Sequence, residues 1–111
     1  MIYVASPYSH PDTAHREMRY EMIRNYVAKH QPAYMEMLYS PIVHWHDAAV
    51  QYDMPTNWDF WWRLNREMID LSSKILVVQL DGWDKSKGVE AELDYAKLIN
   101  KPVTFHDPSQ I

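Results

Sequence analysis

Three residues near position 90 have types and spacing that suit recognition of an anion. Ser86 and Gly88 stand at the start of a helix-compatible segment, and Glu92 follows within its first turns. A helix N-terminus presents unpaired backbone N–H groups and the positive end of the helix dipole, and a serine hydroxyl adds a donor. The same pattern is equally typical of a serine that only caps the helix, so both interpretations stay open.

The acidic residues of this segment cannot act together. Glu90 and Glu92 are two positions apart, so on a helix they point to different faces and only one can reach a ligand. A glutamate near a helix N-terminus most often just complements the dipole. A catalytic role for either residue therefore needs support from elsewhere in the chain.

Histidine and tryptophan side chains offer further chemistry. His44 and His46 would share one side of a strand, but a metal centre needs three or four ligands and the other histidines and carboxylates are scattered, so no metal site is predicted. We expect His44 to line a pocket and His46 to lie at the surface. Trp83 sits in a loop, where it could stack on a base or act as a structural lid. The other tryptophans are typical of a core or a subunit interface.

The elements that must position these residues follow from the apolar pattern. A continuous branched run predicts a central buried strand over 74–80, and apolar residues spaced three and four apart predict helices. The expected strands are 1–5, an edge strand at 37–43, 74–80 and 101–105. The expected helices begin near 12 or 13, 58 and 88 and end near 29, 71 and 99. Residues 44–56 are expected to form an active-site loop or lid with room for one short helix.

This alternation predicts an α/β fold with an open parallel, flavodoxin-like (Rossmann-like) sheet of four to five strands and helices on both faces. Residues 1–111 are expected to form a single domain. Such sheets bind ligands where loops leave the carboxyl ends of the strands. The loops at 6–11 and 81–88 are therefore the expected walls of a binding site.

Composition excludes several classes of protein. The net charge is −4 without a Lys/Arg run, which argues against binding a nucleic-acid polymer. The chain has no cysteine, so a disulfide scaffold, a thiolate nucleophile and Cys-ligated zinc are excluded. No apolar run reaches the roughly 18 residues of a membrane span, and the first residues lack the pattern of a signal peptide. We expect a soluble, cytoplasmic protein without a membrane partner.

Three segments together resemble one known family. They are residues 2–8 (IYVASPY), 80–92 (LDGWDKSKGVEAE) and 101–103 (KPV), in this order. Their combination is similar to the nucleoside 2-deoxyribosyltransferase superfamily, in particular to its small bacterial and phage proteins that carry a Pro-Tyr-Ser-His start and a Gly-Trp-x-x-Ser-x-Gly loop. The serine of that loop resembles the deoxynucleoside-monophosphate N-glycosidases more than the transferases that act on unphosphorylated nucleosides.

The resemblance implies hydrolysis or transfer of the N-glycosidic bond of a 2-deoxynucleoside 5′-monophosphate or a related nucleotide. By position Glu92 would be the nucleophile or the group that stabilises the cationic sugar, and Tyr3 would assist it. Ser86 would lie near the phosphate. No metal and no organic cofactor is implied, and the only partner is a small nucleotide or nucleoside. The implied phosphate or sugar contacts from the first loop are Ser6, Tyr8, Ser9 and His10.

Two departures from the family pattern bear on activity. Relatives carry an aspartate in the helix before the central strand, where this chain offers Asn65 or, one turn later, Asp70. Many relatives also have glycine where this chain has Asp94. The chain is shorter than the characterised enzymes, so the resemblance implies a homodimer or higher homo-oligomer in which a neighbouring subunit completes the pocket. The alternative is a non-catalytic protein that binds or sequesters a nucleotide in the same pocket.

Overall fold

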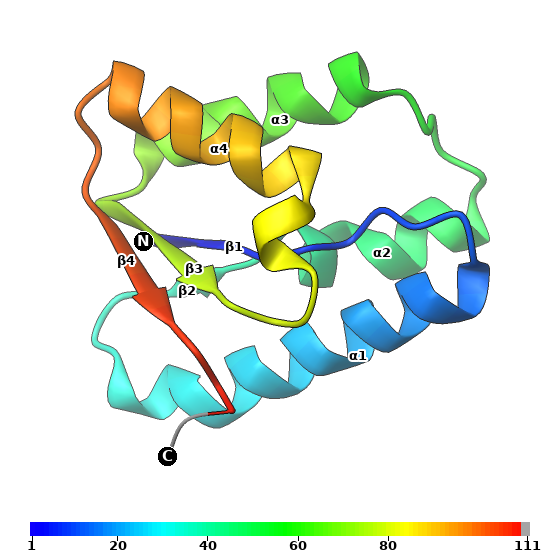
Figure 1. Cartoon of the computed structure of the whole chain (residues 1–111), viewed down its shortest axis with the longest axis horizontal. Helices are drawn as coiled ribbons and strands as arrows, with labels where there is room; N and C mark the ends of the chain where they lie inside the picture. Colours follow the sequence, from blue (N-terminus) through cyan, green and yellow to red (C-terminus); the bar gives the residue numbers. More distant parts are fainter. Residues whose placement is uncertain (110–111) are drawn as a thin grey trace.

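A computed structural model describes residues 1–109 of the chain (Figure 1). It confirms the predicted α/β class, with strands and helices alternating along the sequence. The strands are β1 (Ile2–Ala5), β2 (Leu38–Tyr39), β3 (Lys74–Val78) and β4 (Val103–His106). The α-helices are α1 (Thr13–His30), α2 (Pro41–Gln51), α3 (Trp58–Leu71) and α4 (Lys87–Leu98), and short 3-10 turns form η1 (Gln31–Ala33) and η2 (Trp83–Lys85).

The four strands form one parallel sheet in the order β2-β1-β3-β4. Tyr3 pairs in register with Ile75 of β3 on one side and with Tyr39 of β2 on the other. The chain moves outward from β1 to the edge strand β2 and then crosses back to β3. The direction of winding thus reverses between β1 and β3, and the loops that follow these two strands lie at the point where open α/β sheets bind ligands.

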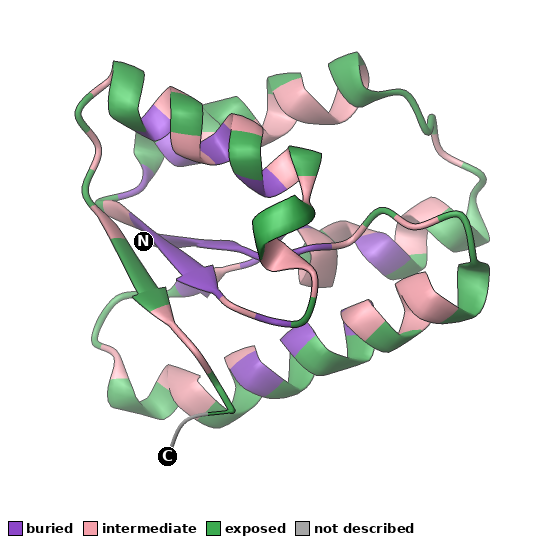
Figure 2. Cartoon of the chain, viewed as in Figure 1, coloured by how far each residue is buried: buried purple, intermediate pink, exposed green. Residues whose placement is uncertain are grey.

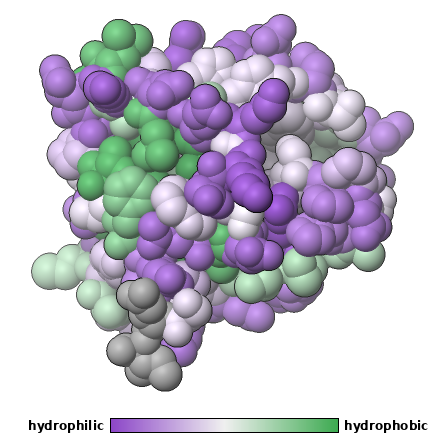
Figure 3. Space-filling model, viewed as in Figure 1, coloured by the Kyte–Doolittle hydropathy of each residue, from purple (hydrophilic) through white to green (hydrophobic). Residues whose placement is uncertain are grey.

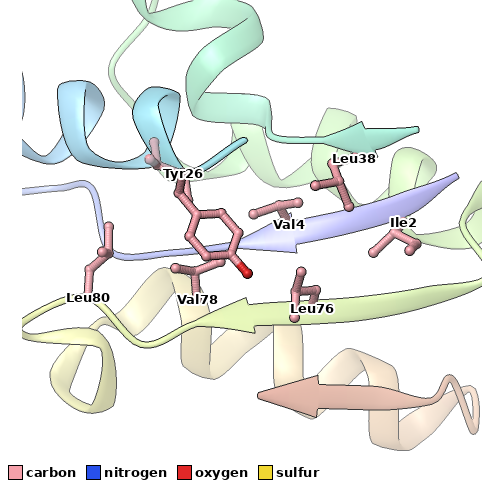
Figure 4. Packing of buried hydrophobic residues seen from close by; sticks show 8 residues of the cluster. Ile2, Val4, Tyr26, Leu38, Leu76, Val78 and Leu80 are labelled. Carbon is pink, nitrogen blue, oxygen red and sulfur yellow. The ribbon is translucent and has the colours of Figure 1, made fainter. Parts of the chain in front are cut away.

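Helices cover both faces of the sheet, and each face has its own apolar core. On the α1 face, Ile23 and Tyr26 pack on Val4, Leu76 and Val78 (Figure 4). On the opposite face, α3 and α4 contribute buried side chains over β1 and β3 (Figure 2). The residues of this second core are Tyr3, Ala5, Ile69, Ile75, Val77, Val89 and Ala96.

The predicted strand over 37–43 is largely wrong, and the helix allowed within 44–56 begins earlier than expected. Only Leu38 and Tyr39 of this segment form a strand, and Pro41 opens helix α2. The Ser40 hydroxyl accepts a hydrogen bond from the Val43 N–H at 3.2 Å, and proline at the first helical position loses no intrahelical bond. Cap and proline together start a helix in a segment whose branched residues favour a strand.

The last strand, β4, is an edge that remains partly uncovered. Phe105 is half exposed, and Leu98 at the end of α4 is exposed as well. Figure 3 shows apolar side chains gathered on the left of this view, the side on which α4 and β4 lie. None of the helices described by the structure is both long and apolar enough to cross a membrane.

Candidate functional site at Tyr3 and Glu92

A tyrosine and a glutamate meet in the core between the sheet and α4. Tyr3 lies on β1 with its side chain on the α3 and α4 face, and its hydroxyl donates a hydrogen bond to Glu92 Oε2. Glu92 belongs to the inward stripe of α4, because Val89 three residues before it and Ala96 four residues after it are buried in the same core. The exposed fraction is 0% for Tyr3 and 5% for Glu92.

Burial sets the protonation of this pair. Removal from water raises the pKa of Glu92 to about 8, although the hydrogen bond from Tyr3 acts in the opposite direction. Burial also raises the pKa of Tyr3 well above its usual value, and the charge and hydrogen bond of Glu92 raise it further. Near neutral pH the ligand-free site therefore holds its proton on Glu92 more often than an exposed glutamate would. A cation placed beside Glu92 would favour the carboxylate.

Aromatic rings lead from this pair toward the surface. The Tyr39 ring lies 6.1 Å from the Tyr3 ring, and the His44 ring lies 5.7 Å from Tyr39. Asn65 is half-buried on α3, one turn before the buried Ile69 and therefore on the same helix face. His44 itself is exposed.

The loop after β1 presents one buried hydroxyl without a partner. Ser6 Oγ is inaccessible to solvent and forms no hydrogen bond within residues 1–109. Its neighbours are engaged: the Tyr8 hydroxyl lies 2.6 Å from His46 Nδ1, the Ser9 carbonyl accepts from Arg19, and His10 Nδ1 accepts from the Asp12 N–H. Ser6 is thus the residue of this loop with a buried hydroxyl that lacks a hydrogen-bond partner, whereas the exposed Ser9 engages its carbonyl.

The loop after β3 supplies the cap of α4, which was one of the two interpretations of Ser86 that the sequence left open. Ser86 Oγ accepts a hydrogen bond from the Val89 N–H at 3.2 Å, so it caps α4. Gly88 follows in the first turn, and a Cβ there would meet the Trp58 ring at 3.8 Å. Trp83 turns toward β4, with its ring centroid 5.8 Å from that of Phe105. Trp83 and Ser86 line a surface hollow of about 200 Å³, but neither Tyr3 nor Glu92 lines it.

Arg19 joins the two loops. Its Nη1 donates to the Ser9 carbonyl at 2.8 Å, and a Cβ at Gly82 would lie only 2.7 Å from its Nη2. Gly82 also has φ +88°, a left-handed conformation that favours glycine. The Arg19 Nε is buried without a hydrogen-bond partner, and the guanidinium forms no ion pair in the described part of the chain. A cation thus lies between the loop that follows β1 and the loop that follows β3.

A known family matches almost the whole length of the chain. The family model Domain of unknown function (DUF1937) matches residues 1–107. The chain belongs to this family. No curated protein matches this DUF1937 chain in a sequence comparison.

The structure does not bring all predicted site residues of this DUF1937 chain together. Asp70 lies near the C-terminal end of α3, beside the start of β3, where it is exposed and accepts a hydrogen bond from the half-buried Tyr95. The expectation for the histidines is reversed, because on α2 they point to different sides: His44 is exposed and His46 is buried. No group of three or more metal-ligating side chains forms among the residues described.

Sequence reasoning missed three residues at this end of the sheet: Arg19, Glu17 and His46. Their partners lie on other elements, so no local spacing connects them. The one available signal was the basic pair Arg16 and Arg19, which comes a few residues after the first loop.

Proposed function

We propose that this protein cleaves the N-glycosidic bond of a 2-deoxynucleoside 5′-monophosphate, by hydrolysis or transfer, with Glu92 as the nucleophile and Tyr3 as its partner. The observation that carries the proposal is the buried hydrogen bond from Tyr3 to Glu92. It joins the first strand to the helix after β3, on either side of the point where the sheet reverses direction. The resemblance to the nucleoside 2-deoxyribosyltransferase superfamily assigns these two residues the same roles.

The chemistry follows from charge. Cleavage of a glycosidic bond passes through a sugar with oxocarbenium character, which a carboxylate stabilises or attacks. Glu92 would form an ester with the anomeric carbon while the base leaves with the bonding electrons and takes up a proton. Water or a second base would then displace Glu92 from the sugar. The Tyr3 hydroxyl orients the carboxylate, and the positive charge that develops on the sugar favours the ionised form of Glu92.

The two loops support a phosphorylated substrate. Arg19 contributes a positive charge between them, and the buried Ser6 hydroxyl has no partner within the part of the chain described here. An oxyanion accepts hydrogen bonds from such groups more strongly than a neutral hydroxyl does. We therefore favour a nucleoside 5′-monophosphate over an unphosphorylated nucleoside. Tyr39, His44 and Asn65 are the nearest groups for the base and sugar.

Release of free base tests this proposal. Purified protein is incubated with the four common deoxynucleoside 5′-monophosphates, and free base is separated by chromatography. We expect release from at least one nucleotide, and a loss of at least about a thousandfold for Glu92→Gln, which keeps the acceptor oxygen but cannot attack. No release by the wild type, or equal release by the variant, would refute catalysis.

One observation favours a second function, a non-catalytic protein that binds or sequesters nucleotides. Glu92 is almost closed off from solvent, and its pKa of about 8 keeps most of it protonated at neutral pH. Binding without turnover would appear as an increase in melting temperature with nucleotide and no free base.

Two expectations from the sequence stay predictions. A homo-oligomer would be seen by light scattering. A cytoplasmic location would be seen with a fluorescent fusion.

A further inference from the structure

A second polar network lies behind the loop that follows β1. His46 on α2 is 4% exposed, and both of its ring nitrogens have partners. Its Nε2 lies 2.8 Å from Glu17 Oε1 on α1, and its Nδ1 lies 2.6 Å from the Tyr8 hydroxyl. The three side chains form a row from a half-exposed carboxylate through a buried imidazole to a half-buried phenol.

Packing fixes the orientation of the imidazole. The Tyr20 ring stacks on His46 with centroids 4.1 Å apart and planes 18° apart, and the Tyr8 ring meets it edge-on at 5.6 Å. Tyr20 is held in turn, because its hydroxyl donates to Asp47 Oδ2 at 3.0 Å. His46 therefore cannot exchange these partners without moving α1 against α2.

The direction of each hydrogen bond depends on one proton. An ionised Glu17 only accepts, so the Nε2 of neutral His46 carries the ring proton and its Nδ1 accepts from the Tyr8 O–H. The Tyr8 hydroxyl then donates its hydrogen bond to His46 and has no proton left to donate to another group. When Nδ1 also gains a proton, it donates to the Tyr8 oxygen, and the Tyr8 O–H is released to donate elsewhere.

Charges of both signs act on Tyr8. Burial raises the pKa of Tyr8 and the Glu17 carboxylate raises it further, whereas the Arg16 guanidinium acts in the opposite direction. Glu17 faces His46 directly from α1, and Asp47 reaches it through Tyr20. Glu21 and Arg24, which also act on Tyr20, pair loosely with each other at 3.9 Å. Arg16 donates to the His10 carbonyl of the same loop at 2.6 Å, so a cation lies near Tyr8 and attracts an oxyanion.

We propose that Tyr8 is an oxyanion site whose occupation is coupled to uptake of one proton by His46. A proton from solvent binds Nδ1, the new N–H donates to the Tyr8 oxygen, and the Tyr8 O–H donates to the oxyanion. The N–H bond is the only covalent bond that forms. Tyr8 is a binding residue, and Glu17 and His46 are positioning residues. The inference rests on the proposed function only for the identity of the anion, a nucleotide 5′-phosphate.

Nitrogen NMR of histidine-labelled protein tests the relay. The His46 signals are assigned by their loss in His46→Gln. In ligand-free protein we expect a protonated Nε2 and an unprotonated Nδ1, and saturation with sulfate or with deoxyadenosine 5′-monophosphate should protonate both nitrogens. Sulfate is included because it does not titrate in this range. A proton on Nδ1 of the neutral ligand-free ring, an unchanged ring at saturation, or no binding of either probe would overturn the proposal.

Affinity supplies a readout that a merely structural role would not move. Binding of sulfate should strengthen as the pH falls, up to tenfold per pH unit, while ligand-free His46 is neutral and bound His46 is charged. Tyr8→Phe should weaken binding roughly 10- to 100-fold and remove this pH dependence. Glu17→Gln should weaken the dependence, whereas Glu21→Gln, one turn along the same helix, should leave it intact. Equal effects of Glu17→Gln and Glu21→Gln would overturn the relay.

Each of the two proposals can be refuted while the other stands. Proton-linked binding of the nucleotide without release of base would leave the relay standing and refute catalysis. Release of base with binding that is independent of pH would do the reverse.

Discussion

The layer between the sheet and helices α3 and α4 contains two tyrosine–carboxylate pairs that differ mainly in burial. Tyr3 donates to Glu92 in the core, and Tyr95 donates to Asp70 at the surface near the other end of α3. Both hydrogen bonds join elements that are far apart in the sequence. The first pair is closed off from water, whereas Asp70 is exposed.

The pKa values of the two tyrosines are raised for different reasons. The pKa of Tyr3 is raised chiefly by burial, whereas that of Tyr95 is raised chiefly by its hydrogen bond to Asp70. In the buried pair, burial also raises the pKa of the Glu92 carboxyl, to about 8. A tyrosine–carboxylate hydrogen bond is thus a surface contact between Tyr95 and Asp70, whereas between Tyr3 and Glu92 it helps to control a proton. Perturbed groups of the second kind are typical of functional sites.

The largest effect should be on turnover. Glu92→Gln should reduce the release of base at least about a thousandfold, because an amide cannot attack the anomeric carbon. The matched change Asp70→Asn removes the charge of the exposed pair and should alter the rate by no more than about twofold. Rates with a deoxynucleoside 5′-monophosphate under single-turnover conditions make the measurement. A thousandfold loss in Asp70→Asn, with Glu92→Gln active, would reverse the roles of the pairs.

The next effect concerns stability. Because the pKa of Glu92 is about 8 in the folded chain and near 4.5 when exposed, the folded state binds more protons between these values. Glu92 therefore costs stability as the pH rises from about 4.5 to 8. Glu92→Gln should be more stable than wild type at pH 8.5 by up to about 5 kcal/mol, since the pKa of Glu92 rises from 4.5 to about 8 and one pKa unit corresponds to about 1.36 kcal/mol.

At pH 4.5 this advantage should disappear. Urea unfolding at the two pH values measures the difference. Asp70→Asn is the control, because its carboxylate keeps contact with water in the folded chain. An advantage of Glu92→Gln that is the same at both pH values would contradict the raised pKa.

The smallest effect is a shift in pH dependence. kcat should rise with pH as Glu92 ionises in the substrate complex. Tyr3→Phe removes the hydrogen bond that lowers the pKa of Glu92, so the rise should move to higher pH, with a kcat on the order of tenfold lower at neutral pH. Tyr95→Phe should leave the midpoint in place. A shift to lower pH in Tyr3→Phe would mean that the tyrosine does not stabilise the carboxylate.

Much of the fold could be predicted because its signals are local. Helix α3 begins and ends close to the positions that its apolar spacing indicates, and β1 and β3 are apolar runs with clear ends. The segment after β2 was mistaken because Ile42 and Val43 favour a strand, while Ser40 and Pro41 start a helix. The tertiary packing of α2 on α1 decides between these signals.

The histidines were misplaced for a different reason. They fell in a segment predicted as a loop or lid, where no periodicity decides which side a residue faces, whereas on α2 residues two apart point to different sides and His46 is the one that faces α1. Glu92 was found because it matches a family pattern together with Tyr3, and its place on the inward stripe of α4 emerged from the structure. Arg19 and the row from Glu17 to Tyr8 depend on contacts between α1, α2 and the first loop, which spacing along the sequence does not encode.

The central claim is that burial raises the pKa of the Glu92 carboxyl, so that Glu92 holds a proton near neutral pH. Carbon NMR of the Glu92 side-chain carboxyl, followed through a pH titration of ligand-free protein and assigned with Glu92→Gln, tests it most directly. We predict a midpoint of about 8 for this carboxyl. A midpoint near the 4.5 of an ordinary glutamate would contradict the account.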